Sequence, residues 1–467
     1  MTRSFQALFR LAVRMHLSCL ALASAAFPAL GSAQSADAIP AKYRDVANRI
    51  IAAAQADSAG AWNRIAELSD RFGHRFSGSQ ALEQAIDWTV TTMKADALDN
   101  VRKERVMVPH WVRGTESLEL VAPRRQLLPM LGLGGSIATP AAGITAEVMV
   151  VASFEELTQR AAEAKGKIVL YDAEWRDYGY NGAFRRQGAV AAAKVGAVAS
   201  LARSAGPYSM RTPHTGNMSY DSTVTKIPHA SVTAEDAMMM RRMIARGEKV
   251  RVTLKMSARM LPDAVSHNVI GELKGREKPA EIVVMGGHID SWDVGQGAMD
   301  DAGGVVAAWE AIRLLKKLGL TPRRTIRVVG WTNEENGGRG GQAYRDAHQS
   351  EVHQLAIESD GGVFSPLGFG FTGSAEARKL VEAVGTLLTP IGAGRIGPTG
   401  GGADIGPIMQ TGVPGMGLEV DGSRYFWFHH TDADTPDKLD PKEVQRCVAA
   451  MAIMAYIVAD LEQGLPR

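Results

Sequence analysis

The sequence predicts an α/β fold in which a mainly parallel, mixed sheet is flanked by helices and carries an inserted β-rich domain. From residue 265 onward, β-like runs alternate with helical ones, as in "EIVVMGG" followed by "GGVVAAWEAIRLLKKL". Between residues 125 and 260, short β-like runs dominate. Such alternation is typical of parallel strands joined by crossover helices. The length of 467 residues allows for two domains.

The first 33 residues have the features of a secretory signal peptide. Arg3, Arg10 and Arg14 precede an uncharged run rich in alanine and leucine, which ends at the small residues 31–33. A membrane anchor is the alternative, but Pro28 interrupts the run, and its strongly apolar part is shorter than the ~20 residues that a spanning helix needs. We therefore expect a protein that is secreted or periplasmic and keeps no membrane anchor after the signal is removed.

The charge and cysteine content of the mature chain exclude several classes of protein. Removal of three arginines from 52 basic residues leaves 49, against 50 acidic ones, so the formal net charge is −1. No basic field remains that would bind nucleic acid or an anionic membrane. One cysteine, Cys447, is left after residue 33, which excludes a disulfide within the mature chain.

Residues 34–124 are predicted to be the N-terminal part of the larger domain. "KYRDVANRIIAAA" and "QALEQAIDWTVTTMKADAL" have the apolar spacing of helices, and "ESLELVAP" that of a strand. Residues 126–146 carry no charge but contain Pro129, Pro140 and several glycines, which favours a loop over a membrane segment.

Residues 125–260 are predicted to form the inserted domain. "AEVMVVAS" and "GKIVLYD" are β-like, and "QGAVAAAKVGAVASLAR" is predicted to be helical. His214 and His229 are isolated in this span, and an isolated histidine is more often a hydrogen-bonded structural residue than a ligand. We expect the insertion to shape access to a site that is built elsewhere.

Residues 261–467 are predicted to contain most of the sheet. "TIRVVGW" precedes the helical "GGQAYRDAHQS", "HQLAIES" precedes "EARKLVEAVGTLL", and a long helix closes the chain. In folds of this class, ligands lie beyond the carboxyl ends of the strands.

Polar side chains follow three of these strands. His288 and Asp290 come after "EIVVM", Glu334 and Glu335 after "IRVVGW", and Asp360 after "LAIES". Any one of them alone would pass for a turn or surface residue. Their placement at successive strand ends makes coincidence improbable.

Two more groups belong to the same predicted site. Asp300 precedes the helix that returns from the first of these strands, and "FWFHHTDADTP" supplies His429, His430 and Asp434. Carboxylates gathered at one rim repel each other unless they are protonated or neutralised by a cation. Imidazoles with carboxylates suit zinc, and one carboxylate that bridges two ions ~3.5 to 4 Å apart would build a two-metal hydrolase site.

The segments "GGHIDSWDVGQGAMDDAGG", "WTNEENGGRG", "ESDGG" and "FWFHHTDADT" resemble the signature segments of the M28 family of co-catalytic dizinc peptidases. The resemblance covers nearly the whole mature chain. It implies a zinc exopeptidase fold with a catalytic domain at 261–467. It also implies that the insertion at 125–260 is a protease-associated domain and that the protein is a homodimer.

The resemblance also implies a role for each site residue. Glu334 takes the position of the general base, and Asp290 that of the carboxylate that orients the imidazole of His288. Many family members have tyrosine as an oxyanion donor directly before the last ligand, where this chain has His429. The five implied ligands of two Zn²⁺ ions per chain are His288 and Asp360 for one ion, Glu335 and His430 for the other, and Asp300 as the bridge.

The resulting hypothesis is an exported metallo-exopeptidase that hydrolyses short peptides, preferentially dipeptides with free termini, by Glu-assisted attack of a water held between two zinc ions. A receptor-like binding protein on the same fold is one alternative, and a single-zinc glutaminyl cyclase is another. The loop "GPTGGGADIGP", with Asp404, either contacts substrate or is a flexible loop.

Overall fold

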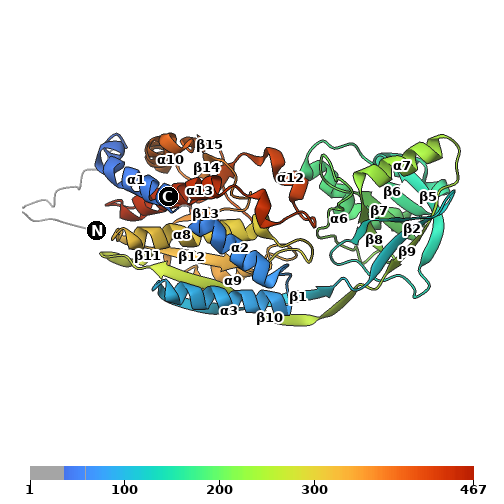
Figure 1. Cartoon of the computed structure of the whole chain (residues 1–467), viewed down its shortest axis with the longest axis horizontal. Helices are drawn as coiled ribbons and strands as arrows, with labels where there is room; N and C mark the ends of the chain where they lie inside the picture. Colours follow the sequence, from blue (N-terminus) through green and yellow to red (C-terminus); the bar gives the residue numbers. More distant parts are fainter. Residues whose placement is uncertain (1–35, 58) are drawn as a thin grey trace, which may run out of the picture. The chain divides into compact units, whose positions relative to one another are not determined.

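The computed structural model describes residues 36–57 and 59–467 (Figure 1). The predicted signal peptide therefore lies outside the described residues. No helix in the described ranges combines the length and apolar character that crossing a membrane requires.

The first of two eight-stranded sheets has parallel pairs in its centre, and the pairs toward its edges are antiparallel except the outermost pair at one edge. This agrees with the predicted mixed α/β fold. Its strands, in spatial order, are β1 (Asp99–Val112), β10 (Arg259–Leu273), β12 (Arg324–Trp331), β11 (Lys278–His288), β13 (Val352–Glu358), β16 (Gly415–Val420), β14 (Pro366–Thr372) and β15 (Arg395–Gly397).

The central strands are buried on both faces, as parallel strands covered by helices require. In β11, Val283 and Met285 belong to one hydrophobic core, whereas Ile282 and Val284 point into another on the opposite face. The continuous apolar run "IVVM" therefore fits a central strand.

Helices cover both faces of this sheet (Figure 1). On one face lie α1 (Ala38–Ala56), α2 (Gly60–Phe72), α3 (Gln80–Ala95), α8 (Gly303–Lys317), α10 (Ala375–Gly385) and α13 (Pro441–Asp460), and on the other α9 (Arg339–His348) and α11 (Gly406–Met409). The shorter helical pieces are α12 (Tyr425–Phe428), the π-helical turn η1 (Ala298–Ala302), and the 3-10 turns η2 (Thr386–Ile391), η3 (Gly422–Arg424) and η4 (Pro436–Lys438). Helix α13 is apolar nearly all round because it is buried in the larger core.

The span from Glu116 to Met256 forms the second sheet, which is also mixed and has its own cores on its two faces. Its strands, in spatial order, are β3 (Gln126–Leu128), β2 (Glu116–Ala122), β9 (Arg251–Met256), β5 (Ile144–Val151), β6 (Ile168–Tyr171), β7 (Ala199–Arg203), β8 (His229–Val232) and β4 (Met130–Gly132). Its helices are α4 (Phe154–Gln159), α5 (Ala161–Ala164), α6 (Tyr178–Lys194) and α7 (Ala234–Ala245).

Two local predictions in this span need correction. The segment "QGAVAAAKVGAVASLAR" is not one helix, because α6 ends at Lys194 and the chain turns at Gly196, which has a φ of +78°, before β7 begins. Residues 126–146, predicted as loop, contribute β3, β4 and the start of β5. Alanine-rich and uncharged stretches have little hydrophobic periodicity. Their conformation depends on pairing with neighbouring strands of the sheet.

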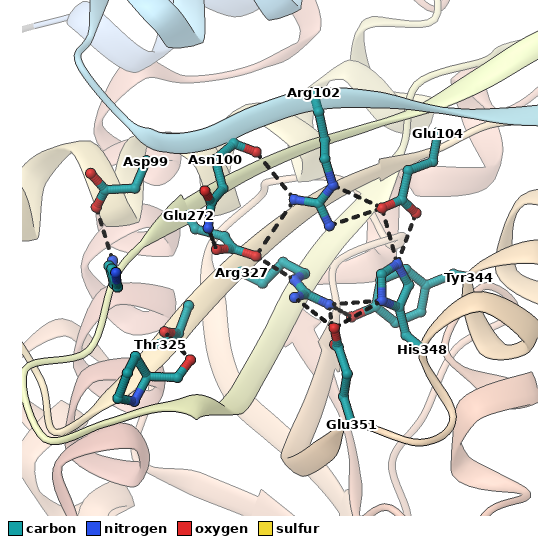
Figure 2. Close-up of polar contacts among 12 residues, drawn as sticks. Asp99, Asn100, Arg102, Glu104, Glu272, Thr325, Arg327, Tyr344, His348 and Glu351 are labelled. Carbon is teal, nitrogen blue, oxygen red and sulfur yellow. Dashed lines mark hydrogen bonds and ion pairs between the residues drawn. The ribbon is translucent and has the colours of Figure 1, made fainter.

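A buried network of ion pairs ties α9 to the antiparallel edge of the first sheet (Figure 2). Arg327 on β12 donates to Glu272 on β10 at 2.8 Å and to Glu351 at 2.6 Å. His348, the last residue of α9, contacts Glu104 on β1 at 2.8 Å through Nε2 and Glu351 at 3.2 Å through Nδ1. Its members come from β1, β10, β12, α9 and the turn that leads into β13.

Candidate active site

The predicted site residues lie together beyond the carboxyl ends of three parallel strands. His288 ends β11 and is paired with Trp331, which ends β12. Gly286 on β11 is paired with Glu358, which ends β13. The loops that leave these three positions therefore start from one edge of the sheet.

One group of candidate ligands consists of His288, Asp300 and Asp360. Nε2 of His288 lies 3.1 Å from Oδ1 of Asp300 and 3.2 Å from Oδ1 of Asp360. Nδ1 of His288 donates to the backbone carbonyl of Asp290 at 2.9 Å. This hydrogen bond fixes the tautomer in which the Nε2 lone pair points at the two carboxylates.

The side chain of Asp290 has a different partner from the one expected. Its carboxylate lies 3.8 Å from Nδ1 of His288, farther than its own backbone carbonyl. It accepts the backbone amide of Glu334 at 3.1 Å instead. Asp290 therefore orients His288 through its carbonyl and positions the backbone of Glu334 through its carboxylate.

A second group consists of Asp300, Glu335 and His430. Nε2 of His430 lies 3.2 Å from Oδ2 of Asp300 and 3.0 Å from Oε2 of Glu335. Nδ1 of His430 faces the backbone carbonyl of Thr215, in the span of the second sheet, at 3.4 Å. Asp300 thus presents one oxygen to each group, which is the geometry that a bridging ligand needs.

Buried carboxylates hold the backbone that carries these ligands. Asp434 accepts the amides of Met299 at 2.8 Å and Asp300 at 3.2 Å. Asp301 accepts the amides of His288 and Gly304, both at 3.0 Å. These hydrogen bonds fix the backbone on both sides of Asp300 without the help of a metal ion.

A buried arginine clamps the glycine-rich loop of residues 289–297 through hydrogen bonds to its backbone. Arg75 is fully buried and donates to the carbonyls of Ile289, Gln296 and Gly297, each at 2.8 Å. Gly297 has a φ of +55°, and a Cβ there would lie 2.3 Å from the side chain of Ser291. Only glycine fits this turn, which directs the following residues, including Asp300, toward the site.

The electrostatics of the site are those of crowded carboxylates. Burial and repulsion from neighbouring carboxylates raise the pKa of Glu334 well above its ordinary value and that of Glu335 to about 7. Burial opposes ionisation of Asp300 too, but the close imidazoles of His288 and His430 hold its pKa well below the ordinary value. Asp300 is therefore the carboxylate that is most strongly favoured in its charged form.

The donor set fits zinc. Each group offers imidazole nitrogen and carboxylate oxygen, and its ligand atoms lie within 4.8 Å of one another, close enough to surround one small ion. Oδ2 of Asp300 and Oε1 of Glu335 are buried without a hydrogen-bond partner among the described residues. Such orphaned acceptors are costly unless a cation satisfies them.

A cavity of about 260 Å³ opens onto both groups. Glu334, which belongs to neither group, is part of its wall. The other lining residues are Tyr178, Arg185, Asn217, Asp300, Glu335, Asp360, Tyr425, Phe426, His429 and His430.

His429 is buried beside the second group. Its ring stacks on that of His430, with 3.6 Å between the centroids, and its Nε2 lies 3.4 Å from Oδ2 of Asp300. Its Nδ1 is 3.1 Å from Nε2 of His214. Burial and the neighbouring His430 lower the pKa of His429 well below its ordinary value, so its ring is neutral.

Sequence reasoning missed several of these neighbours. His214 was expected to be an isolated structural residue, but its ring contacts His429. Arg185 and Tyr178 on α6 line the cavity with Tyr425, and no local pattern marked them. For Asp301, the adjacent "DD" pair was a signal that could have been followed. His229 does fit the expected structural role, because it is buried and contacts Ser200 at 2.8 Å.

Comparisons with known proteins identify the family of this chain. Residues 268–455 match the model of peptidase family M28. Carboxypeptidase Q of Xenopus laevis is 49% identical over 429 residues, which cover 91% of this chain and 92% of that protein. The chain belongs to peptidase family M28. It is accordingly a zinc metallopeptidase, which favours catalysis over a receptor role.

Solved structures extend the match of this M28 peptidase to the whole fold. The peptidase M28 precursor from Shewanella amazonensis superposes with a TM-score of 0.88 at 35% identity, covering 93% of this chain and 99% of that one. A zinc aminopeptidase from Bacillus subtilis, at 20% identity, has a TM-score of 0.66 and covers 87% of this chain and 96% of that one. The second likeness concerns the fold alone.

Proposed function

We propose that this M28 peptidase is an exopeptidase that holds two zinc ions and hydrolyses short peptides, preferentially dipeptides with free termini. The single observation that carries the proposal is the position of Asp300, whose two oxygens serve two separate groups of ligand atoms. The first ion would be held by His288 and Asp360, the second by Glu335 and His430, and Asp300 would bridge them.

Zinc and Glu334 have different roles in the proposed reaction. Zinc, when bound, supplies a Lewis acid that polarises the peptide carbonyl and makes water acidic near neutral pH. Glu334 accepts a proton from the water whose oxygen attacks the carbonyl carbon, and it delivers that proton to the amine as the C–N bond breaks. Its raised pKa suits a group that must both accept and release a proton.

The oxyanion donor is proposed to be His429, which stands directly before the last ligand. Its neutral ring and its burial in the cavity wall support this role. Its Nε2 faces Asp300 at 3.4 Å, so the ring must turn toward the substrate to donate. Tyr425 lines the same cavity and is the second candidate donor.

The second sheet is proposed to be the protease-associated domain expected at 125–260, between the N-terminal part at 34–124 and the catalytic part at 261–467. The contacts of His214 and Thr215 with the histidine pair support a role at the site. Export through the signal peptide at 1–33 and assembly as a homodimer complete the proposal. N-terminal sequencing of the exported protein and analytical ultracentrifugation test these two points.

The decisive experiment is replacement of the proposed base. Glu334→Gln should lower kcat for alanyl-leucine by about 10²- to 10⁴-fold while the zinc content stays at that of the wild type. Glu376→Gln, at an exposed position of α10, is the matched control and should leave both unchanged. Activity retained by Glu334→Gln would remove this residue from the mechanism.

The choice of reaction has its own tests. A longer peptide blocked at both termini should resist cleavage, and its hydrolysis would contradict an exopeptidase. A glutaminyl peptide should gain water, whereas loss of ammonia would favour the glutaminyl cyclase alternative.

A further inference from the structure

Arg185 is a buried cation in the wall of the candidate active site, and no carboxylate among residues 36–57 and 59–467 pairs with it. The residue is 7% exposed, and its Nε is buried without a hydrogen-bond partner among the described residues. Its Nη1 donates to the carbonyl of Thr215 at 3.1 Å, and the guanidinium lies 5.2 Å from the ring centre of Tyr178. A Cβ at position 216 would lie 2.1 Å from Nη1, so Gly216 makes the space that the guanidinium occupies.

The contact of Arg185 with His430 does not give the guanidinium a hydrogen-bond acceptor. Nη1 lies 3.5 Å from Nδ1 of His430. An imidazole that offers Nε2 to a metal ion carries its proton on Nδ1, and that proton points at the carbonyl of Thr215. Two donors therefore face each other, and the guanidinium keeps donors free for another acceptor.

A buried, unpaired guanidinium is costly, and a carboxylate is the acceptor that matches its planar fork. Because Arg185 contacts a candidate metal ligand, a carboxylate bound to it must lie very close to the bond that is cleaved. Successive Cα atoms are about 3.8 Å apart, so this position suits the C-terminal residue directly after the cleaved bond.

We propose that Arg185 binds the α-carboxylate of the C-terminal residue of the substrate and thereby places the last peptide bond at the metal centre. This inference rests on the proposed exopeptidase function and deepens it. The substrate class that it names is peptides with a free C-terminal carboxylate, cleaved one residue from that end.

The test compares one dipeptide in two forms, alanyl-leucine and alanyl-leucinamide, with zinc-loaded protein. Wild type should prefer the free acid. Arg185→Gln should lower kcat/KM for the acid by about 10- to 100-fold and change that for the amide by less than about threefold, as loss of a charged hydrogen bond predicts. Arg185→Lys, which keeps the charge but loses the planar guanidinium, should have a kcat/KM for the acid between those of wild type and Arg185→Gln. Arg186→Gln, at the exposed neighbouring position, is the control and should match wild type.

Binding without turnover gives a second readout. Calorimetry should show that alanyl-leucine binds about 10- to 100-fold more weakly to Glu334→Gln/Arg185→Gln than to Glu334→Gln, with equal zinc contents. An equal loss of kcat/KM on acid and amide would overturn the proposal, as would equal hydrolysis of both by wild type. Hydrolysis of neither by wild type would contradict the exopeptidase function itself.

Discussion

The carboxylate of Asp434 accepts the backbone amide of Asp300 at 3.2 Å, and it takes the amide of the preceding residue at 2.8 Å. Asp434 contacts no candidate ligand side chain through these bonds, yet it fixes the backbone that presents the shared ligand. Its burial raises its pKa to about 7.

Replacing Asp434 should weaken metal binding. In Asp434→Asn, the amide group puts a donor where one of two backbone amides needs an acceptor, and zinc affinity should fall about 10- to 100-fold. Competition with a chelator measures the change. Asp432→Asn, at an exposed position of the same loop, should bind zinc like wild type, and an equal loss there would point to a general effect on the loop.

The number of zinc ions bound should depend more strongly on Asp300 than on a ligand that belongs to one group only. Wild type should hold two ions per chain. Asp360→Asn should lower the content to about one, because it removes a ligand from one group, whereas Asp300→Asn should lower it below one, because it removes a ligand from both. Atomic absorption after gel filtration gives these values. Equal zinc contents in the two variants would contradict a bridging role for Asp300.

The clamp formed by Arg75 should contribute strongly to the stability of the fold. Arg75→Met removes three hydrogen bonds to backbone carbonyls and should lower the free energy of unfolding by about 3 kcal/mol or more. Arg71→Met, which removes an exposed ion pair of α2 with Glu67, should cost less than about 1 kcal/mol. Urea denaturation compares them, and similar losses would argue against the clamp.

The network around His348 should make stability depend on pH (Figure 2). Burial opposes protonation of His348, but hydrogen bonds with Glu104 and Glu351 raise its pKa above the ordinary value. The charged ring therefore stabilises the fold fully below a pH of about 6.5, and this contribution is lost as the pH rises through the raised pKa.

The variant His348→Gln should isolate this effect from the other histidines. With zinc-saturated proteins, the Tm of wild type should exceed that of the variant at pH 5.5, by an amount equivalent to about 1 to 2 kcal/mol. The difference should shrink at pH 9. A constant difference across this range would show that the charge of His348 is not responsible.

Much of the fold could be predicted because local patterns and tertiary partners agree. The apolar run of β11 and the helical pattern of α8 each indicate one conformation, and both form as expected. The candidate ligands come together because parallel strands end at one edge, a rule that needs no knowledge of side-chain rotamers.

Other features depend on contacts across hundreds of positions. Arg185 and His214 reach the site only because the second sheet packs there, and nothing adjacent to them in sequence marks that. Nδ1 of His288 lies 2.9 Å from the carbonyl oxygen of Asp290 and 3.8 Å from its carboxylate, and spacing in the sequence does not predict which of the two is closer.

The proposed sharing of Asp300 would have a thermodynamic consequence for how zinc enters and leaves. An ion held through Oδ1 would draw charge away from Oδ2, so filling one half of the site would alter the affinity of the other half. By reciprocity, each half would influence the other by the same factor. Uptake and release would then be linked equilibria, which a single dissociation constant could not describe.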